Sequence, residues 1–519
     1  MKYIDTVVIG GGVLGCFAAR NLLRWNMSVL LIEKEEDICR GITKANSAIV
    51  YSGCDNKPGS LKAELTVRAN GRFDTLCREL DVPFHRCGSV AAAVGPCGEH
   101  VLQEKYEQGK RNGVPGMQLL SGEEARKMEP YLSADVTRAL YVPGTGTVNP
   151  WQLGIAAYEN ALQNGCEAWM NTEVTGIQKT EQGYLIKCKG KKISRSGMSN
   201  DPVRTERLIQ EEEAEKIVVC RAVINCAGLS ADRVQELLFP PSIRLFPDGA
   251  GFLVLDRDCP GPEHIVFQEM EDGKGITAIP AVEGNLLLAS PKRNQEGEPF
   301  STDHEVLGKI KQMTAELLPE MDCSRVIRSF GAVRPNPHRV KAIVADCKEW
   351  NEAAEKTAED EVLEKKENIR YLPDGKNIGS FSIEHPEDGF YSLIGIKTPG
   401  LTCADELGKY LAERMAAYLG TGENPWFDPV RKGIPSVHRM TFEEREAFVK
   451  QHPEYGEVIC RCEDITKGEI LEAVQRGAKT AEGVKRRVGT GMGRCQGSRC
   501  SQKIERLIKE CNGNMISLS

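Results

Sequence analysis

The sequence predicts an α/β protein with more than one domain, and three observations support this prediction. Its 519 residues exceed what a single core usually holds, so two to four domains are expected. A glycine-rich turn between a strand pattern and a helix pattern opens the chain, which is typical of a doubly wound α/β domain. Near the other end, four cysteines lie in two close pairs among short helix patterns, which indicates a small helical metal-binding domain.

The N-terminal turn has the spacing of a dinucleotide-binding motif. Gly10, Gly12 and Gly15 fit G-x-G-x-x-G after an apolar strand at 3–9, and a second apolar strand ends in Glu33. The first glycine permits a tight turn, the second lets backbone N–H groups approach a pyrophosphate, and the third lets the helix pack on the strand. Glu33 can accept hydrogen bonds from the adenosine ribose. The motif predicts a Rossmann-type site, and its spacing leaves FAD and NAD open.

The cysteine motif predicts a metal centre. C-x-C and C-x4-C pairs stand 32 residues apart, formed by Cys460, Cys462, Cys495 and Cys500. Four thiolates in two pairs can hold a [2Fe–2S] cluster. A zinc site built from the same four residues is the alternative, although zinc sites more often use C-x2-C to C-x4-C pairs.

The helix patterns around these cysteines are short. Thr466 and Glu469 have the spacing of a capping box, a second helix is expected from about Thr480, and a third carries Ile504. Such a small unit has too little core to rely on packing alone. The metal centre should therefore supply much of its stability. The remaining cysteines are expected to be reduced, buried thiols.

The overall composition narrows the classes of partner. The net charge is −7 and no basic stripe is interleaved with aromatic residues, so nucleic acid is not an expected partner. The N-terminus lacks the pattern of a signal peptide, and no run reaches the roughly 18 apolar residues of a spanning helix. A cytoplasmic protein without direct membrane contact is expected. Charged stretches interrupt the pattern near 190–215 and 349–368, and no chemistry is assigned to either; the second is interpreted as a solvated helix or a mobile insertion.

A second glycine-containing turn lies late in the chain. The segment Gly395-Ile-Lys-Thr-Pro-Gly-Leu-Thr402 follows a strand pattern and opens a helix that runs to about residue 418. A helix start offers free N–H groups to an electron-rich oxygen. Taken alone, the segment could equally be an ordinary strand-to-helix turn.

Taken together, these segments resemble the glycine/D-amino-acid-oxidase superfamily of flavoproteins, and most closely the FAD subunit of anaerobic glycerol-3-phosphate dehydrogenases. Asn46-Ser-Ala-Ile-Val, Pro58-Gly-Ser-Leu-Lys-Ala and Ile327-Arg-Ser-Phe carry this likeness. The cysteine tail is similar to the bacterioferritin-associated-ferredoxin (BFD) type of [2Fe–2S] domain. The resemblance implies FAD contacts at Gly10, Gly12, Gly15, Glu33, Ser47, Val174, Ala227, Gly228, Gly400, Leu401 and Thr402.

The resemblance also implies a division of the chain. It places a Rossmann-type FAD-binding domain and an α+β substrate domain in residues 1–425, a connector at 426–454 and a BFD-like domain at 455–519. The FAD-binding segments are expected at about 1–85, 145–235 and 330–425, and the substrate-domain segments at about 86–144 and 236–329.

The substrate side departs from the relatives. Tyr51 stands where they often have a histidine, which leaves acid/base chemistry and a simple pocket wall both open. Arg334 matches the arginine of a Phe-Ala-Gly-Leu-Arg-Pro motif and is the expected anchor for an anionic substrate. Lys292 and Lys397 are weaker candidates for anion contacts. The cofactor motifs hold while the substrate motifs drift, which predicts an altered substrate.

The expected function is that of an FAD-dependent dehydrogenase. Its substrate would be a small anionic secondary alcohol such as glycerol 3-phosphate or a 2-hydroxy acid. Electrons would pass through the [2Fe–2S] cluster to a partner, which the resemblance suggests is a flavoprotein of the pyridine-nucleotide-disulfide type or another acceptor. C–N oxidation of an amino acid, opine or amine remains an alternative. So does a non-catalytic electron-transfer subunit.

Overall fold

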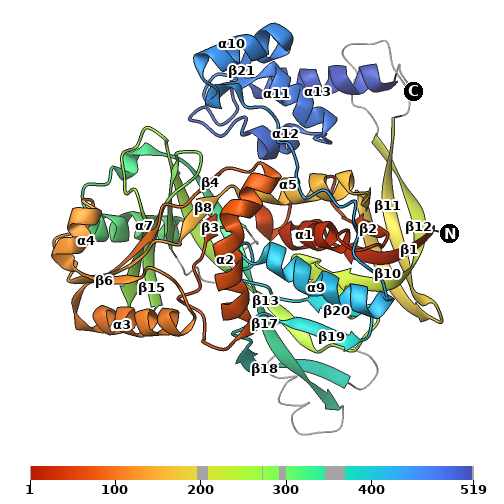
Figure 1. Ribbon diagram of the computed structural model, residues 1–519, viewed down its shortest axis with the longest axis horizontal. Helices are drawn as coiled ribbons and strands as arrows, with labels where there is room; N and C mark the ends of the chain where they lie inside the picture. The colour runs from red at the N-terminus through yellow and green to blue at the C-terminus, as the bar shows by residue number, and fades with distance from the viewer. Residues whose placement is uncertain (1, 196–208, 272, 291–299, 345–368, 517–519) are drawn as a thin grey trace.

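The computed structural model describes residues 2–195, 209–271, 273–290, 300–344 and 369–516. Two large sheets with covering helices form the body, and a small, mostly helical unit lies against one side of it (Figure 1). The α/β fold class is therefore confirmed. The predicted insertion at 349–368 and the candidate Lys292 lie outside the described residues.

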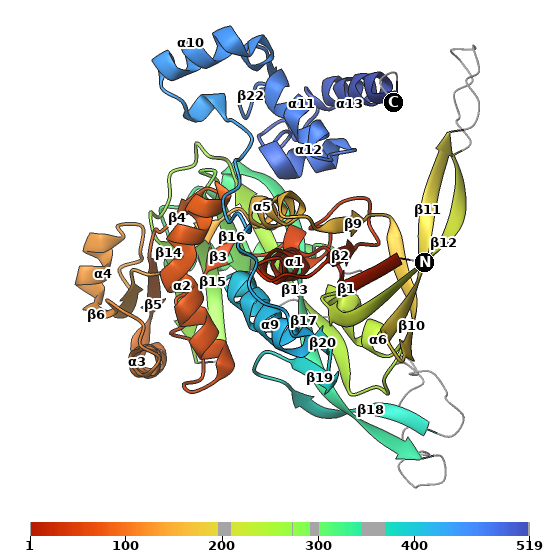
Figure 2. The ribbon, with the colours of Figure 1, turned by 45° about the vertical axis from the view of Figure 1, so that its right-hand side comes forward.

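The first sheet has eight strands and a parallel centre. β1 pairs in parallel with β2 and β12, β2 pairs in parallel with β9, and β12 pairs in parallel with β20. β10 and β11 form a hairpin around the Glu181-Gln-Gly183 turn, and the antiparallel strands β11 and β12 extend together beyond the body (Figure 2). The bounds are β1 (Lys2–Ile9), β2 (Val29–Ile32), β9 (Glu167–Trp169), β10 (Thr172–Thr180), β11 (Gly183–Arg195), β12 (Ile209–Asn225), β19 (Ile383–Glu387) and β20 (Phe390–Leu393).

Helices cover one face of this sheet. They are α1 (Val13–Leu22), α2 (Leu61–Leu80), α5 (Pro150–Gln163) and α9 (Ala404–Leu419), and α1 packs against both α5 and α9. Successive strand side chains point to opposite faces. Val8 accordingly packs with the residues of α1 and α9, whereas Val7 and Ile9 join the core on the other face, around Tyr184.

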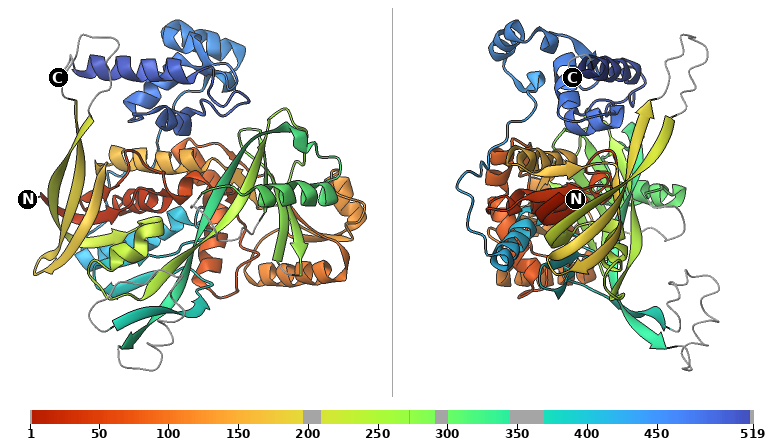
Figure 3. Two further views of the ribbon diagram at one scale, coloured as in Figure 1. Left: turned by 180° about the vertical axis from the view of Figure 1, so that it is seen from behind. Right: turned by 90° about the vertical axis from the view of Figure 1, so that its right-hand side faces the viewer.

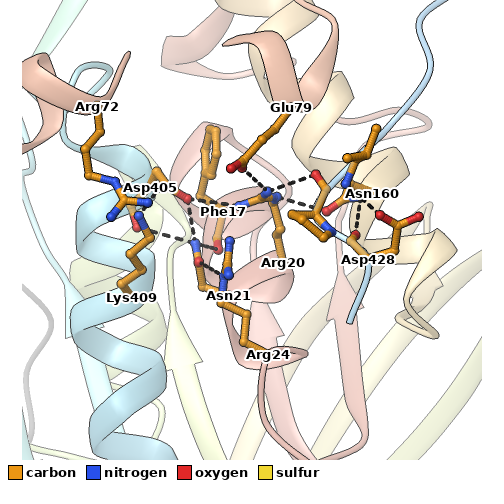
Figure 4. Close-up of polar contacts among 12 residues, drawn as sticks. Phe17, Arg20, Asn21, Arg24, Arg72, Glu79, Asn160, Asp405, Lys409 and Asp428 are labelled. Atoms are coloured by element: carbon orange, nitrogen blue, oxygen red, sulfur yellow. Dashed lines mark hydrogen bonds and ion pairs between the residues drawn. The ribbon is translucent and has the colours of Figure 1, made fainter. Parts of the chain in front are cut away.

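A buried arginine links these helices (Figure 4). Arg20 of α1 is fully buried, and its Nε donates to Asn160 Oδ1 of α5 at 2.9 Å. Its Nη1 lies 3.2 Å from Asp405 Oδ1 of α9, and its Nη2 lies 3.2 Å from Glu79 Oε2 of α2. The same Nη2 donates to the carbonyl of Pro429, in the segment that leads to the C-terminal unit. The Arg20 guanidinium therefore links α1, α2, α5 and α9 to one another and to the connector.

The second sheet has nine strands in the order β18-β17-β13-β16-β15-β14-β5-β7-β6. The bounds are β5 (Ser89–Ala93), β6 (Gln118–Ser121), β7 (Arg138–Val142), β13 (Ile243–Leu255), β14 (Ile265–Met270), β15 (Gly273–Pro280), β16 (Leu286–Ser290), β17 (Val326–Val344) and β18 (Ile369–Asn377). The resemblance implies an FAD-binding segment from about residue 330 onward. β17 lies in the second sheet, where residues 326–339 pair with β13 and residues 340–344 pair with β18.

The two faces of the second sheet have different roles. Leu253 and Leu255 of β13 pack with α7 (His304–Leu317) and α4 (Gly122–Met128) on one face. Phe252 and Val254 point to the opposite face, which α3 (Gly95–Arg111) covers in part. Seen from behind, the long green strands β13 and β17 run diagonally between the two halves of the body (Figure 3). The second sheet thus presents one apolar face toward the first domain.

Short elements join the two sheets and form the C-terminal unit. β3 (Ile49–Val50), β8 (Gly146–Val148) and β4 (Phe84–His85) make a three-stranded sheet in the body. The C-terminal unit contains α10 (Phe442–Gln451), β21 (Val458–Cys460), β22 (Ile465–Thr466), α11 (Lys467–Gln475), α12 (Ala481–Val488) and α13 (Ser501–Ile516).

The helix starts predicted in this unit are confirmed. Thr466 and Glu469 form the capping box of α11, Thr480 caps α12, and Ile504 of α13 packs in the same core. The segment expected to be a plain connector contains the capped helix α10. None of the helices in the described part of the chain combines the length and apolarity that a bilayer crossing demands.

We expect Arg20→Met to destabilise the body strongly. The change leaves Glu79 and the buried Asp405 without their shared cation, and removing one partner of a buried ion pair typically costs about 3–5 kcal/mol. Lys409 still lies 2.6 Å from Asp405, so the loss in free energy of unfolding should fall near the lower end. Urea unfolding followed by circular dichroism measures this loss.

Arg24→Met is the matched control for this substitution. Arg24 lies one turn further along the chain, where its guanidinium covers the Phe427 ring at 4.5 Å and donates to Asn21. Its loss should cost about 1 kcal/mol or less. Equal losses for the two variants would contradict a central role of Arg20.

Candidate functional site

A cavity of about 480 Å³ lies between the two sheets. Its size falls within the range of small-molecule and cofactor sites. Three segments form its walls: the glycine turn with the loop after β2, the face of the second sheet, and the turn that precedes α9. The predicted site residues on its walls are Gly10, Gly12, Glu33, Ser47, Tyr51, Ala227, Gly228, Arg334, Gly400 and Leu401.

The glycine turn is built by close backbone contacts. Gly10 has a φ of +103°, and a Cβ there would lie 2.5 Å from the carbonyl oxygen of Cys226. A Cβ on Gly15 would lie 1.8 Å from the carbonyl oxygen of Gly10. Gly15 does not line the cavity, because its role is to bring α1 against the turn. Gly12 has only Thr43 Oγ1 near its Cβ position, at 3.5 Å, so its side facing the cavity stays open for a ligand.

The loop after β2 closes over this turn. Glu33 Oε2 accepts from the Gly11 N–H at 2.6 Å, and its Oε1 accepts from the Glu35 N–H at 2.9 Å. Burial raises the pKa of Glu33, although these two hydrogen bonds oppose the shift. Thr43 was not predicted, yet its hydroxyl accepts from the Val13 N–H at 3.0 Å and lines the cavity. No local spacing marks Thr43, because it reaches the helix start from 30 residues away.

The turn before α9 forms the opposite wall. Gly400 and Leu401 line the cavity, whereas Thr402 lies buried behind them. The Thr402 hydroxyl accepts from the Tyr51 N–H at 3.0 Å, and the Tyr51 ring stacks on Phe267 with their centroids 6.4 Å apart. The tyrosine is thus held between the late turn and the second sheet.

The second sheet supplies an apolar wall with cations at one edge. The apolar side chains include Phe252, Phe267, Ile279 and Ala289. Arg334 of β17 stands opposite Asp248 of β13, with Nη1 and Oδ2 3.8 Å apart. Lys397 lies on the neighbouring wall, where burial and the nearby Arg334 lower its pKa. Burial and Lys397 in turn lower the pKa of Lys62. Two cations, Arg334 and Lys397, therefore line this part of the cavity, and Lys62 is near enough to Lys397 for their charges to interact.

Val174 is the predicted cofactor residue that the structure does not bring to this cavity. It lies on β10, and its half-buried side chain packs against the core on the far face of the first sheet. The other two outside the lining, Gly15 and Thr402, support the wall from behind.

The four cysteines form a second centre in the C-terminal unit. Their thiols pair across the two motifs: Cys462 and Cys495 lie 3.5 Å apart, and Cys460 is hydrogen-bonded to Cys500. Two thiol pairs suit a centre with two iron atoms. Across the described residues, no three His, Cys, Asp or Glu side chains surround one point as ligands of a single metal ion would.

Glycines bring the two cysteine loops together. A Cβ on Gly493 would lie 2.6 Å from Cys462 Cβ, and Gly491 and Gly497 have positive φ. Burial acts to raise the pKa of Cys495, yet hydrogen bonds from the Arg499 backbone N–H and from Cys462 lower it below the ordinary thiol value. Backbone donors around a thiolate are what an anionic metal centre requires.

Comparison with protein families identifies the body of the chain. Residues 5–414 match the family of FAD dependent oxidoreductases, which is well over half of the sequence. The chain belongs to this family. Residues 458–510 match the BFD-like [2Fe-2S] binding domain. Both resemblances drawn from the motifs are therefore confirmed, and the two matches imply FAD and a [2Fe–2S] cluster.

Individual relatives of this oxidoreductase carry informative names. It is 33% identical to a glycerol 3-phosphate dehydrogenase of Caloramator mitchellensis, over 99% of this chain and 96% of that protein. It is 32% identical to the mitochondrial L-2-hydroxyglutarate dehydrogenase of Homo sapiens, over 55% of this chain and 60% of that protein. Anaerobic glycerol-3-phosphate dehydrogenase subunit A1 of Haloferax volcanii is 23% identical, over 97% of this chain and 82% of that protein.

A solved structure supports the fold. The FAD-bound L-alpha-glycerophosphate oxidase of Mycoplasma pneumoniae superposes with a TM-score of 0.63 at 20% identity, covering 83% of this chain and 99% of that one. The glycine turn fits such a cofactor, since Gly10 and Gly15 pack against backbone while the side of Gly12 that faces the cavity stays open. The cavity then continues from this cradle to the second sheet.

The BFD-like domain is attached to the body at the loop after β2. Asp37 lies four residues after Glu33 and is buried between Arg486 and Arg487 of α12. Its Oδ2 accepts from Arg486 Nη2 at 2.6 Å and from Arg487 Nη1 at 2.8 Å, and its Oδ1 accepts from Arg487 Nη2 at 3.0 Å. Burial acts to raise the pKa of Asp37, but the two arginines outweigh it and hold that pKa below the ordinary value.

We expect Gly15→Ala to abolish FAD binding, because the new methyl group would collide with backbone at Gly10. Gly12→Ala is the matched control, since its methyl group meets Thr43 at ordinary contact distance. That variant should fold normally and bind FAD about tenfold more weakly, because a ligand phosphate can no longer approach the backbone closely. Flavin titration of the cofactor-free proteins measures both effects. Equal affinity of Gly15→Ala and wild type would contradict the cradle.

We expect Asp37→Asn to release the BFD-like domain. It leaves two buried arginines unpaired, which typically costs about 3–5 kcal/mol. Because the pKa of Asp37 is lowered on folding, acid should act similarly: the stabilisation is complete above the ordinary aspartate pKa of about 3.9 and is lost as the pH falls through the lower, folded-state value. Limited proteolysis of the connector reports release.

Glu36→Gln is the control for this substitution. Glu36 neighbours Asp37 but pairs with the half-buried Arg40 and only weakly with Thr480. Its connector should remain as resistant to protease as that of wild type. Protection of the connector in Asp37→Asn would show that the arginine clamp is dispensable.

Proposed function

We propose that this oxidoreductase dehydrogenates a small anionic secondary alcohol and passes the electrons through a [2Fe–2S] cluster to an outside acceptor. The observation that carries the proposal is the pair of cations Arg334 and Lys397, which line the cavity beside the apolar wall of the second sheet. Like charges held this close repel one another, and a bound phosphate or carboxylate would offset that repulsion.

The names of two relatives agree with this chemistry. One is a glycerol 3-phosphate dehydrogenase and the other an L-2-hydroxyglutarate dehydrogenase. Both named substrates are anions that carry a secondary hydroxyl group. A site that binds the anion through Arg334 and holds the alcohol carbon against the apolar wall would accept either class. The length of the substrate's carbon chain would then decide between them.

The residues of the chain divide the remaining tasks. When bound, FAD supplies the hydride acceptor. Arg334 would bind the anionic group with two parallel hydrogen bonds, as a planar guanidinium does. Phe252 and Phe267 would exclude water from the reacting carbon. Tyr51, fixed by its backbone bond to Thr402 and by stacking on Phe267, would face the substrate and could move the hydroxyl proton.

The C-terminal domain would serve as the electron exit. We retain residues 1–425 as the flavoprotein body, 426–454 as the connector and 455–519 as the cluster domain, with Cys460, Cys462, Cys495 and Cys500 as ligands. One relative is named as a subunit of an anaerobic dehydrogenase. By analogy, a separate protein would accept the electrons here, for which we propose a flavoprotein of the pyridine-nucleotide-disulfide type.

Anaerobic bleaching of the flavin by a panel of substrates tests this function. Glycerol 3-phosphate or a 2-hydroxy acid should bleach the wild type. Arg334→Ala should lower kcat/KM by about a hundredfold or more, because truncating a charge-assisted anchor costs about 2–5 kcal/mol. Arg339→Ala is the matched control: it lies on the same strand, exposed and paired with Glu384, and should bleach normally.

The other outcomes of this panel separate the alternatives. Bleaching by amino or N-alkyl acids alone would move the reaction to C–N oxidation. No bleaching by any class, with both cofactors bound, would favour a subunit that only relays electrons. In a bleaching wild type, a Tyr51→Phe variant that loses kcat but keeps KM would assign the proton transfer to Tyr51, and an unchanged variant would leave Tyr51 as a wall.

A further inference from the structure

A three-residue loop of the second sheet contacts both cysteine loops. It consists of Asp256, Arg257 and Asp258, which directly follow β13, and we refer to it as the acidic–basic–acidic loop. Arg257 Nη2 donates to the backbone carbonyl of Cys462 at 2.5 Å and lies 2.6 Å from Glu463 Oε2. The guanidinium therefore touches a predicted metal ligand and its neighbour together.

The two carboxylates of this loop face the second cysteine loop. Arg494, which directly precedes Cys495, forms ion pairs with both Asp256 and Asp258. All three charges of the acidic–basic–acidic loop thus face an opposite charge adjacent to Cys462 or Cys495. These are the two cysteines that remain partly exposed, whereas Cys460 and Cys500 are buried in the domain's own core.

The loop is continuous with the wall of the cavity. Phe252 of β13 lines the cavity, and Asp256 follows it four positions later in the chain. A strand rises about 3.3 Å per residue, so the cavity wall and the loop lie about 13 Å apart along one strand. β13 and the loop that directly follows it therefore connect the cavity wall to the exposed cysteine edge.

The exposure of these contacts suggests orientation rather than strong attachment. Asp256 and Glu463 are largely shielded, whereas the side chains of Asp258 and Arg494 are 60% and 61% exposed. Exposed ion pairs add little to affinity. The buried clamp of Asp37 with Arg486 and Arg487 is the stronger anchor. The loop then fixes how the domain is rotated about that anchor.

We propose that the acidic–basic–acidic loop is a docking seat that positions the Cys462–Cys495 edge against the body of the protein. It sets both the spacing of this edge from the cavity wall and the charge beside the ligands. Charge and hydrogen bonds around the ligand residues tune the potential of an iron–sulfur centre. The use of this seat in turnover rests on the function proposed above, but its existence as a contact does not.

A charge swap in the full-length protein loaded with FAD and cluster tests the seat. The flavin is reduced by light in the presence of EDTA, so no substrate is needed, and the subsequent reduction of the cluster is timed by its absorbance. Arg257→Glu should slow this reduction about tenfold and increase hydrogen exchange in 458–466 and 489–500. The double variant Arg257→Glu/Glu463→Arg restores the ion pair with its charges exchanged, and should recover to within about threefold of wild type.

Arg461→Glu is the matched control. Arg461 is exposed and lies between Cys460 and Cys462, so it changes the charge beside the cysteines as much as Arg257→Glu does. It should shift the cluster potential without increasing hydrogen exchange. Arg494→Glu is a second test variant. Because the Arg494 side chain is exposed, its replacement should not cause misfolding.

Two results would overturn the seat. One is wild-type exchange and reduction rates in both Arg257→Glu and Arg494→Glu. The other is a charge-swapped double variant no better than its parent. Either result can occur in a protein that oxidises its substrate normally. Conversely, a protein that oxidises no substrate can still show the expected pattern, so failure of the seat and failure of the proposed function are distinguishable.

Discussion

The buried guanidinium of Arg20 is the constraint on which the positions of the two turns in the cavity wall depend. α1 begins directly after the glycine turn, and α9 begins directly after the Gly400–Thr402 turn, so both helix N-termini are positioned where the cavity walls meet. Arg20 binds Asp405 in the first turn of α9 and so fixes the two helices against each other. A buried charge is tolerated only when fully paired, which makes this arrangement strict.

The cavity combines two environments that neither domain could provide alone. The first domain contributes backbone N–H groups and a helix terminus, which favour phosphate oxygens. The second sheet contributes Phe252, Phe267 and Ile279, which lower the local dielectric. Electrostatic attraction between Arg334 and an anion is stronger in such surroundings than in water. The apolar wall and the cations therefore act together rather than as separate features.

Features that depend on residues close together in the sequence could be predicted, whereas features that depend on distant residues could not. The glycine turn, the acid at Glu33, the capping box and the cysteine motif all rest on local spacing and could be predicted. Thr43 could not, because its hydroxyl reaches α1 only through the fold. The hydrogen bond from Arg487 to Asp37 joins residues 450 positions apart, so local spacing could not reveal it. Local sequence also does not show that β17 joins the second sheet, because that follows from its pairing with β13 and β18, which are distant in sequence.

The attachment of the BFD-like domain links it to the nucleotide site. The loop that carries Asp37 packs on the glycine turn: the Cys39 N–H donates to the Gly11 carbonyl at 2.9 Å, and Ile38 lies beside Gly11. A dinucleotide held by that turn and a domain held by Asp37 both require the same loop conformation. Two ligands that stabilise one conformation favour each other's binding reciprocally. A dinucleotide bound at the glycine turn would therefore favour docking of the C-terminal domain through residues 36–39, and docking would favour its binding.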